Sequence, residues 1–284
     1  MKILLLGATG LLGTTLRALL NKRGKNVVGV AHSGTDWSFD LRSKTALNKC
    51  IQNERPDIIV NAAAMVNLTA CEESPLEAYA INTRLVSQLV DLCRSSGIYL
   101  LQISTDHYYT GDGRKKHTED APIVLINEYA KTKYIGECFT KIYANSLVVR
   151  TNFVGTQKGF LHWVINALKN KERITLFDDF YTSTLAVNQL AYILCDLLQL
   201  QPHGILNVAS SEVKSKKEFI MGVAKYLNVQ DFSYNIGSVH ALKGVLRGDS
   251  LGLSTEKVEH VVGYPMPNFT AVLKSLFKEE NHAI

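Results

Sequence analysis

The feature that most constrains the fold is a run of glycines at a spacing of three, Gly7, Gly10 and Gly13, near the start of this 284-residue chain. The run follows a short apolar segment at 3–6 and precedes leucines at helical spacing. Glycine allows a sharp turn between a strand and a helix, and it lets an anion approach the N–H groups at the helix N-terminus. The pattern therefore predicts a strand–turn–helix unit that holds the pyrophosphate of a dinucleotide. The residues expected to contact it are Gly7, Thr9, Gly10, Leu11, Leu12 and Gly13.

Short apolar or β-branched segments alternate with amphipathic segments over the first 150 residues, which is typical of βαβ units around a parallel sheet. Tyr79 is expected on the apolar side of a long helix predicted at 76–96. After residue 237 the pattern indicates a proline-containing turn at 264–267 and one last helix. Strands are predicted at 3–6, 27–31, 58–61, 99–104, 147–150, 174–177 and 205–208. The helices predicted before the last one are at 12–20, 76–96, 127–143, 161–171, 187–200 and 216–227.

These elements predict an α/β fold: a Rossmann-like doubly wound parallel sheet with a smaller C-terminal substrate lobe. Residues 1–152, completed by about 178–208, are expected to form the NAD(P)-binding domain. Residues 153–177 and 209–284 are expected to form the substrate-binding lobe.

Composition narrows the class of protein. Hydrophobic residues make up 46% and charged residues 20%, as in ordinary globular proteins. The net charge of +5 is not gathered into a block, so no nucleic-acid partner is expected. Neither a long apolar run nor a secretion signal is visible, which predicts no membrane association. The five scattered cysteines are expected to be reduced core thiols, which favours a cytoplasmic location.

The end of the second predicted strand bears on cofactor choice. Many NAD-binding folds place a carboxylate there to bind the ribose 2′ hydroxyl. Residues 31–35 contain none, and His32 and Ser33 could donate to a 2′-phosphate. NADP(H) is therefore favoured, with NAD(H) as the alternative. Next along the chain, Asp40 and Leu41 could lie beside the adenine, although Asp40 could equally be a turn aspartate that caps the helix after Arg42.

A candidate acid–base pair lies in the helix predicted at 127–143. Tyr129 and Lys133 are four residues apart, so they share a helix face. A nearby ammonium favours the phenolate and moves the phenol pKa from about 10 toward the working range. The helix follows a predicted strand that ends near Ser104 to Asp106, at the edge where α/β sheets bind ligands.

Seven segments of the chain form an ordered set: 7–13, 61–64, 77–82, 104–106, 117–122, 129–133 with Gly136 and Glu137, and 150–151. Together they resemble the extended short-chain dehydrogenase/reductase superfamily, and most closely the dTDP-4-dehydrorhamnose reductase family. The segment at 251–257, with Gly263 and Pro267, is a weaker match to the C-terminal end of that family.

The resemblance implies an NAD(P)H-dependent reductase of a nucleotide-linked 4-keto-6-deoxysugar, in dTDP-rhamnose and polysaccharide biosynthesis. Tyr129 would protonate the sugar carbonyl oxygen, Thr105 would hydrogen-bond that oxygen, and Lys133 would hold the nicotinamide ribose. Asn82 could support the site or be a buried packing amide. Further cofactor contacts are expected from Ala62, Ala63, Ala64 and Ser104.

The substrate side departs from the family pattern. Phe153 stands where relatives usually carry a Trp near the nucleobase, and it could still stack on a base. Thr105, Asp106, Asn152 and Arg247 are the polar candidates for substrate binding. The eight histidines show no metal-ligand spacing, so no metal is expected, and they are interpreted as surface or loop residues.

Two other functions stay open on the sequence. One is a sugar-nucleotide epimerase or dehydratase of the same superfamily, although dehydratases carry an Asp-Glu pair where this chain has Asp106 and His107. The other is a non-catalytic nucleotide-binding regulatory subunit, although such proteins often lose the Tyr or Lys that Tyr129 and Lys133 preserve. A nucleotide sugar is the expected substrate, and a homodimer is left open.

Overall fold

The computed structural model describes residues 1–277 and confirms the predicted α/β fold with a Rossmann-like parallel sheet. The chain divides into two compact units. Unit 1 comprises Met1–Thr105, Asn127–Arg150 and Ala191–Leu206. Unit 2 comprises Asp106–Ile126, Thr151–Leu190 and the described residues from Asn207. The expected division into cofactor and substrate domains stays a prediction.

Seven strands form the main sheet, in the order β11-β6-β5-β4-β1-β2-β3. Every neighbouring pair from β6 to β3 is parallel. The order reverses between β1 and β4, which creates the crevice where doubly wound sheets bind ligands. The strands are β1 (Lys2–Leu6), β2 (Asn26–Ala31), β3 (Trp37–Ser38), β4 (Ile58–Asn61), β5 (Tyr99–Ile103), β6 (Ser146–Thr151) and β11 (Gly204–Val208).

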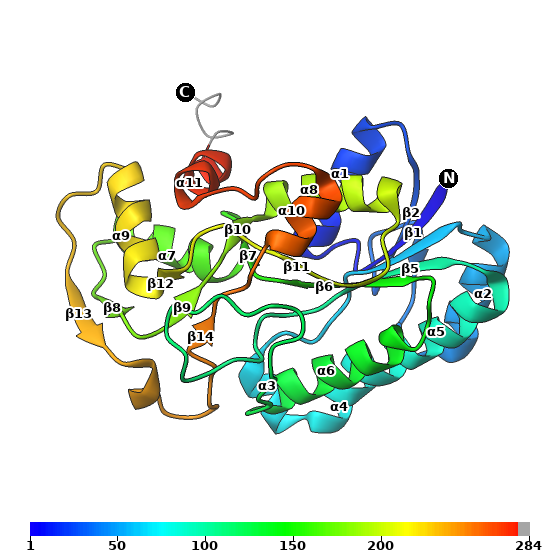
Figure 1. The fold of residues 1–284 in the computed structure, drawn as a ribbon, viewed down its shortest axis with the longest axis horizontal. Helices are drawn as coiled ribbons and strands as arrows, with labels where there is room; N and C mark the ends of the chain where they lie inside the picture. The colour runs from blue at the N-terminus through cyan, green and yellow to red at the C-terminus, as the bar shows by residue number, and fades with distance from the viewer. Residues whose placement is uncertain (278–284) are drawn as a thin grey trace. The chain divides into compact units, whose positions relative to one another are not determined.

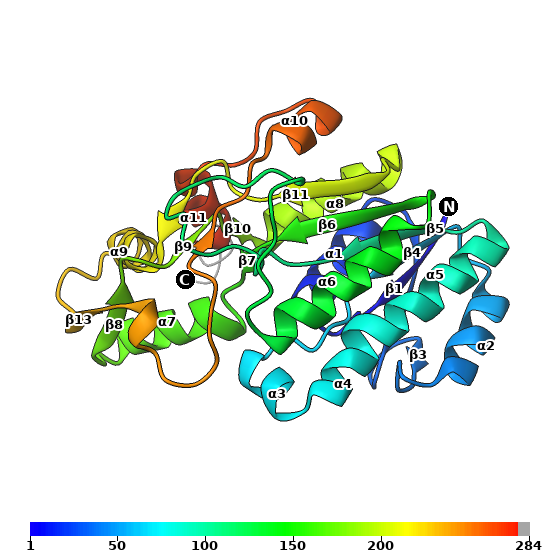
Figure 2. The same ribbon diagram turned by 60° about the horizontal axis from the view of Figure 1, so that its bottom comes forward.

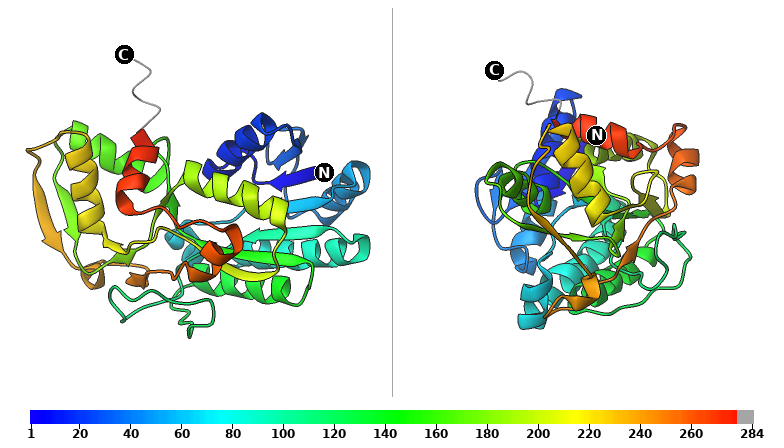
Figure 3. Two further views of the ribbon diagram at one scale, coloured as in Figure 1. Left: turned by 45° about the horizontal axis from the view of Figure 1, so that its top comes forward. Right: turned by 90° about the vertical axis from the view of Figure 1, so that its left-hand side faces the viewer.

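Helices cover both faces of this sheet (Figures 1 and 2). Helices α1 (Leu11–Lys22) and α8 (Val187–Leu200) lie on one face, joined by an ion pair between Arg23 and Asp196 at 2.8 Å (Figure 3, left). Helices α2 (Lys44–Glu54), α5 (Leu85–Ser96) and α6 (Glu128–Lys141) lie on the other. Leu4 and Leu6 of β1 point to that second face and join its core, as the alternation of side chains along a strand requires.

One helix carries an insertion that the sequence pattern did not reveal. The segment predicted as a single helix at 76–96 is α4 (Pro75–Tyr79), a π-helical turn (Ala80–Arg84) and α5. A π turn adds one residue and shifts the helical register by that residue. The prediction that Tyr79 faces the core was therefore wrong: Tyr79 is 44% exposed, and Ala78 is fully buried in its place.

Unit 2 is built from shorter strands and three longer helices (Figure 1). Strands β8 and β13 pair in parallel, and β9 lies between β12 and β14. A 3-10 turn of this unit covers Val239–Ala241. The short helix α3 (Leu68–Glu73), by contrast, belongs to unit 1. The unit 2 elements are β7 (Phe153–Val154), α7 (Gly159–Lys169), β8 (Ile174–Phe177), β9 (Tyr181–Thr182), β10 (Leu185–Ala186), β12 (Lys214–Ser215), α9 (Lys216–Tyr226), β13 (Tyr234–Gly237), β14 (Ser250–Leu251), α10 (Glu256–Val262) and α11 (Phe269–Phe277).

Three expectations need correction. The strand predicted at 99–104 ends at Ile103, and the turn at 264–267 is flanked by two helices, α10 and α11, where one was expected. Cys138 is exposed, so it is not a core thiol, while the other four cysteines are buried. Among residues 1–277, no helix combines the length and apolarity needed to cross a membrane.

Candidate active site

The glycine-rich turn lies tightly against the ends of the central strands. The N–H groups of Gly7 and Ala8 both donate to the carbonyl oxygen of Val30, at 2.9 and 3.2 Å. Gly7 has a φ of +79°, and a Cβ there would lie 2.8 Å from the amide nitrogen of Ala63. A Cβ on Gly13 would lie 2.1 Å from the carbonyl oxygen of Gly7. Glycine is therefore required at both positions, which leaves a bare backbone turn suited to a pyrophosphate.

A cavity of about 370 Å³ opens beside this turn, within unit 1. Many of the predicted cofactor residues line it. Four lining residues were not predicted from the sequence, because no motif contains them and they reach the cavity from separate elements of the fold. The predicted lining residues are Gly7, Thr9, Gly10, His32, Leu41, Ala62, Ala63 and Ala64, and the missed ones are Ala31, Met65, Glu77 and Ile81.

Other predicted cofactor residues lie outside the lining of this cavity. Leu12 and Gly13 are buried in α1, Leu11 is half-buried, and Ser33 is exposed. The hydroxyl of Ser104 donates to a carboxylate oxygen of Glu137 at 2.6 Å. A cofactor contact by these residues stays a prediction.

An arginine bridges two carboxylates at the cavity. The Arg42 guanidinium binds both oxygens of Asp40 and also pairs with Glu77. These hydrogen bonds lower the pKa of Asp40 to about 2. Ser43, not Asp40, caps α2, accepting from the N–H of Ala46 at 3.3 Å. The capping role considered for Asp40 was therefore wrong, and its place beside an adenine stays a prediction.

The Tyr129/Lys133 pair is buried on the inner face of α6. Asn127 caps this helix by accepting from the N–H of Ala130 at 2.8 Å, so the pair lies in its first two turns. Lys133 Nζ donates to the carbonyl oxygen of Ile103 at 2.7 Å. Burial lowers the pKa of Lys133 to about 8, while the Glu137 carboxylate acts in the opposite direction. The hydrogen bond to Ile103 holds the end of β5 against the face of α6 that carries Tyr129 and Lys133. The backbone just before Thr105 therefore lies at that face.

A buried ion pair supports the same corner of unit 1. Arg150 at the end of β6 donates to Glu137 through Nε and Nη2, with Nη2 2.9 Å from Oε2. Both side chains are almost completely buried. Glu137 also accepts from Ser104, so one carboxylate of α6 links the residue that follows β5 to the end of β6.

The amide of Asn82 holds the loop that follows β4. Its Oδ1 accepts from the N–H of Met65 at 2.9 Å, and its Nδ2 donates to the Met65 carbonyl and to Thr132 Oγ1. A Cβ on Gly136 would lie 2.4 Å from the Asn82 carbonyl oxygen, so α6 approaches the π turn closely. Asn82 is thus a packing amide that fixes a residue of the cavity wall.

In unit 2, two of the predicted substrate residues contact each other. Asn152 Nδ2 donates to buried Asp106 Oδ2 at 2.8 Å, and Asn152 Oδ1 accepts from Thr184 at 2.9 Å. Both ends of that amide are therefore engaged. Phe153 is half-buried in β7, beside β10, and Arg247 is exposed. Substrate contacts by these residues stay predictions.

The histidines are less uniform than expected. His117 lies in the loop between β5 and α6, but it is buried there and stacks on Tyr109, with ring centroids 3.9 Å apart, so it is a loop residue and not a surface one. Burial is the main cause of the lowered pKa of His107, about 4, so its imidazole is neutral at pH 7. Within the part of the chain that the structure describes, no group of three or more His, Cys, Asp or Glu is arranged to hold a metal ion.

Comparison with known proteins shows which family this chain resembles. The family described as RmlD substrate binding domain matches residues 1–282. A dTDP-4-dehydrorhamnose reductase of Escherichia coli K12 is 30% identical over 194 residues, which cover 67% of this chain but only 64% of that relative. A hypothetical dTDP-4-dehydrorhamnose reductase of Sulfolobus tokodaii is 28% identical, with a TM-score of 0.86 over 94% of this chain and 97% of that one.

A dTDP-4-dehydrorhamnose reductase of Bacillus anthracis, solved in complex with NADP, is 24% identical, with a TM-score of 0.89 over 98% of this chain and 99% of that one. At that identity the likeness shows the fold alone. The family match covers nearly the whole chain, and the resemblance predicted from the sequence is confirmed. This chain belongs to the RmlD substrate binding domain family, among relatives named dTDP-4-dehydrorhamnose reductase.

Proposed function

We propose that this chain is an NAD(P)H-dependent reductase of a nucleotide-linked 4-keto-6-deoxysugar. The observation that carries the proposal is the buried Tyr129/Lys133 pair, held at the end of β5 by the bond from Lys133 to Ile103. The names of the E. coli and S. tokodaii relatives support the substrate class. Unit 1 would hold the cofactor and unit 2 the nucleotide sugar.

Each of the candidate site residues would have a distinct role in the reduction. The Tyr129 hydroxyl would donate its proton to the carbonyl oxygen of the sugar, and Thr105 would hydrogen-bond the same oxygen. Lys133 would bind ribose hydroxyls and stabilise the phenolate left on Tyr129. The turn at Gly7 and Gly13, which leaves no room for a Cβ, would hold the pyrophosphate. A bound nicotinamide supplies the hydride.

The lowered pKa of Lys133 predicts a pH dependence. The ammonium form is lost as pH rises through about 8, and with it the charge that stabilises the Tyr129 phenolate. We expect kcat/KM to fall as pH rises above that value, because this ratio reports ionisations of the free enzyme. The pH profile of the Lys133→Met variant should lack this limb. A wild-type profile that stays flat to pH 10 would contradict the assignment.

For the cofactor, we propose a preference for NADP(H), with Arg17 beside the 2′-phosphate. A second cavity of unit 1, about 410 Å³, is lined by Thr9, Arg17, Gly34 and Thr35 among others, and Thr9 also lines the first cavity. Arg17 Nη2 pairs with Asp36 at 2.6 Å, and Asp36 also accepts from the N–H of Gly29 at 2.7 Å. Asp36 is thus held by Arg17 and the β2 backbone, and Arg17, not Asp36, lines the cavity.

The Arg17→Leu variant tests this preference. We expect the Kd for NADPH to rise about tenfold, the effect of losing one partly screened charge contact, with the Kd for NADH unchanged. Cofactor titration by protein fluorescence measures both constants. Lys22→Leu, on the same helix but outside the cavity lining, is the matched control. Equal losses for both cofactors, or tighter wild-type binding of NADH, would remove the proposed role of Arg17.

A further inference from the structure

One carboxylate lies at the centre of the buried corner of unit 1, where α6 meets the ends of β5 and β6. Glu137 is fully buried in α6, one helical turn after Lys133. The hydroxyl of Ser104 donates to its Oε1 at 2.6 Å, and Arg150 Nη2 lies 2.9 Å from its Oε2. Apolar side chains of similar size often replace a buried ion pair without loss of stability. Stability alone therefore does not require a carboxylate at this position.

The short segment that leads into Thr105 is fixed by three hydrogen bonds. Lys133 Nζ donates to the carbonyl oxygen of Ile103 at 2.7 Å. The backbone N–H of Ser104 donates to the carbonyl oxygen of Val149, also at 2.7 Å. The third bond is the one from the Ser104 hydroxyl to the buried carboxylate. Because Thr105 follows Ser104 directly and is itself buried, the position of its hydroxyl depends on how Ser104 is held.

Glu137 also acts on the charge of Lys133. Burial lowers the pKa of Lys133 to about 8, and the Glu137 carboxylate opposes this effect by favouring the ammonium. The other titratable groups of this corner are Tyr129 on α6 and Arg150 on β6, and the Arg150 guanidinium is paired with Glu137 itself. Without the carboxylate, burial would act unopposed and the pKa of Lys133 would fall further.

We propose that Glu137 is a positioning residue of the reductase, which fixes Thr105 through Ser104 and keeps Lys133 in its ammonium form. The inference rests on the proposed function and gives the carboxylate two separable roles. One role is geometric, because the bond to Ser104 holds the backbone before Thr105. The other is electrostatic, because only a negative charge favours the ammonium. Ser104 then acts as a link within the protein, in place of the cofactor contact expected from the family pattern.

The Ser104→Ala variant tests the geometric role, since it removes the hydrogen bond and leaves the charge of Glu137. Thr105 would hydrogen-bond the oxygen that gains charge during hydride transfer. Its misplacement should therefore lower kcat about tenfold to a hundredfold and change KM less. The Kd for NADPH should stay unchanged, whereas the loss of a direct cofactor contact would raise it. The fall of kcat/KM at alkaline pH should remain at about pH 8.

The double variant Glu137→Gln/Arg150→Met tests the electrostatic role. It removes the carboxylate charge and keeps an acceptor for Ser104, because a glutamine side chain still presents a carbonyl oxygen. Replacing both partners also avoids an unpaired buried charge. The alkaline fall of kcat/KM should move to lower pH by about one unit, the smaller end of the effect of a neighbouring opposite charge.

Thr140→Val is the matched control. It removes another buried hydroxyl of α6, one that donates to the carbonyl oxygen of Gly136 at 3.1 Å. We expect this variant to leave kcat and the pH profile unchanged. Melting temperatures of all the variants report any general loss of folding.

The outcomes distinguish this inference from the proposed function. If the wild-type protein reduces a dTDP-linked 4-keto-6-deoxysugar, an unchanged kcat in Ser104→Ala or an unmoved pH profile in the double variant would overturn the positioning role and leave the reductase intact. Absence of wild-type turnover would instead refute the reductase. NMR titration of Lys133 in protein with isotope-labelled lysine needs no turnover, and an unchanged midpoint in the double variant would overturn the electrostatic role.

Discussion

Replacing Tyr129 with phenylalanine should lower turnover by about 10²–10⁴, the contribution of one general acid. The variant keeps the ring that packs in the buried face of α6 and loses only the hydroxyl. Cofactor affinity should therefore stay nearly unchanged. Steady-state kinetics with a nucleotide-linked keto-sugar measure the first effect, and cofactor titration measures the second.

Tyr134→Phe is the control for that experiment. Tyr134 lies on the same helix, but its hydroxyl is engaged with Cys138, and we expect nearly wild-type turnover from the variant. Equal losses in the two variants would point to a general disturbance of α6. Wild-type turnover in Tyr129→Phe would remove Tyr129 from the chemistry.

The second large effect concerns stability. Glu137→Gln removes the only carboxylate that the Arg150 guanidinium pairs with in the described ion pairs, and Arg150 is buried at the end of β6. Loss of one partner from a buried pair leaves an uncompensated charge, so the free energy of unfolding should fall by about 3–5 kcal/mol. Urea unfolding measures this, and the double variant Glu137→Gln/Arg150→Met should recover part of the loss. A single variant as stable as the wild type would show that water or other groups compensate Arg150.

The sequence predicted most of the sheet because its signals are local. The glycine turn, the buried apolar strands and the helices with regular apolar spacing each depend on residues within one segment. The π turn at Ala80–Arg84 shows no such local signal, and it packs against Gly136 of α6, a residue far from it in the sequence. The two-residue strands of unit 2 are too short to show any alternation.

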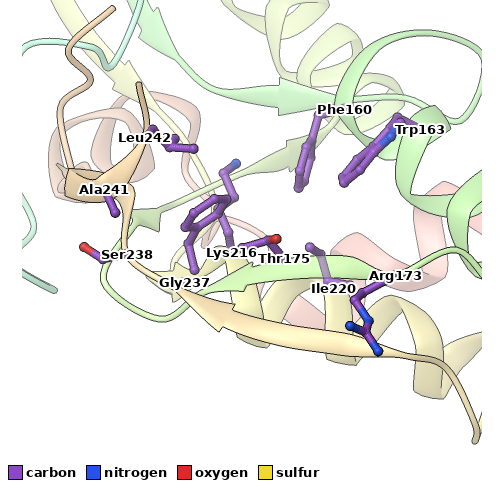
Figure 4. A pocket seen from close by; sticks show the side chains of 11 residues that line it. Phe160, Trp163, Arg173, Thr175, Lys216, Ile220, Gly237, Ser238, Ala241 and Leu242 are labelled. Atoms are coloured by element: carbon purple, nitrogen blue, oxygen red, sulfur yellow. The ribbon is translucent and has the colours of Figure 1, made fainter. Parts of the chain in front are cut away.

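The residues of the candidate site could be predicted from the sequence where one motif contains them. They could not be predicted where segments far apart in the sequence meet. Tyr129 and Lys133 share a helix face by spacing alone. Glu77 enters the wall of the first cavity, and Arg17 faces the second, only because loops after β2 and β4 fold back onto α1 and α4. A cavity of about 430 Å³ in unit 2, with Lys216 in its lining (Figure 4), joins residues from α7, β8, α9 and the segment after β13, which no single stretch of sequence reveals.

The dehydratase alternative meets a specific difficulty. The residue after Asp106 is His107, whose pKa of about 4 leaves it neutral, so it does not supply the negative charge of the second carboxylate that dehydratases carry there. Epimerisation and reduction both use hydride transfer, but only reduction consumes the reduced cofactor. Product analysis is needed to distinguish them.

The most direct test follows the hydride itself. The protein is incubated with NADPH that carries deuterium at the transferable nicotinamide position and with dTDP-linked 4-keto-6-deoxysugar, and the sugar is examined by NMR. The account predicts that one NADPH is consumed per sugar and that one deuterium appears on C4 of the product, whose keto group has become a hydroxyl. A sugar that is inverted or dehydrated without net consumption of NADPH, or no reaction at all, would contradict it.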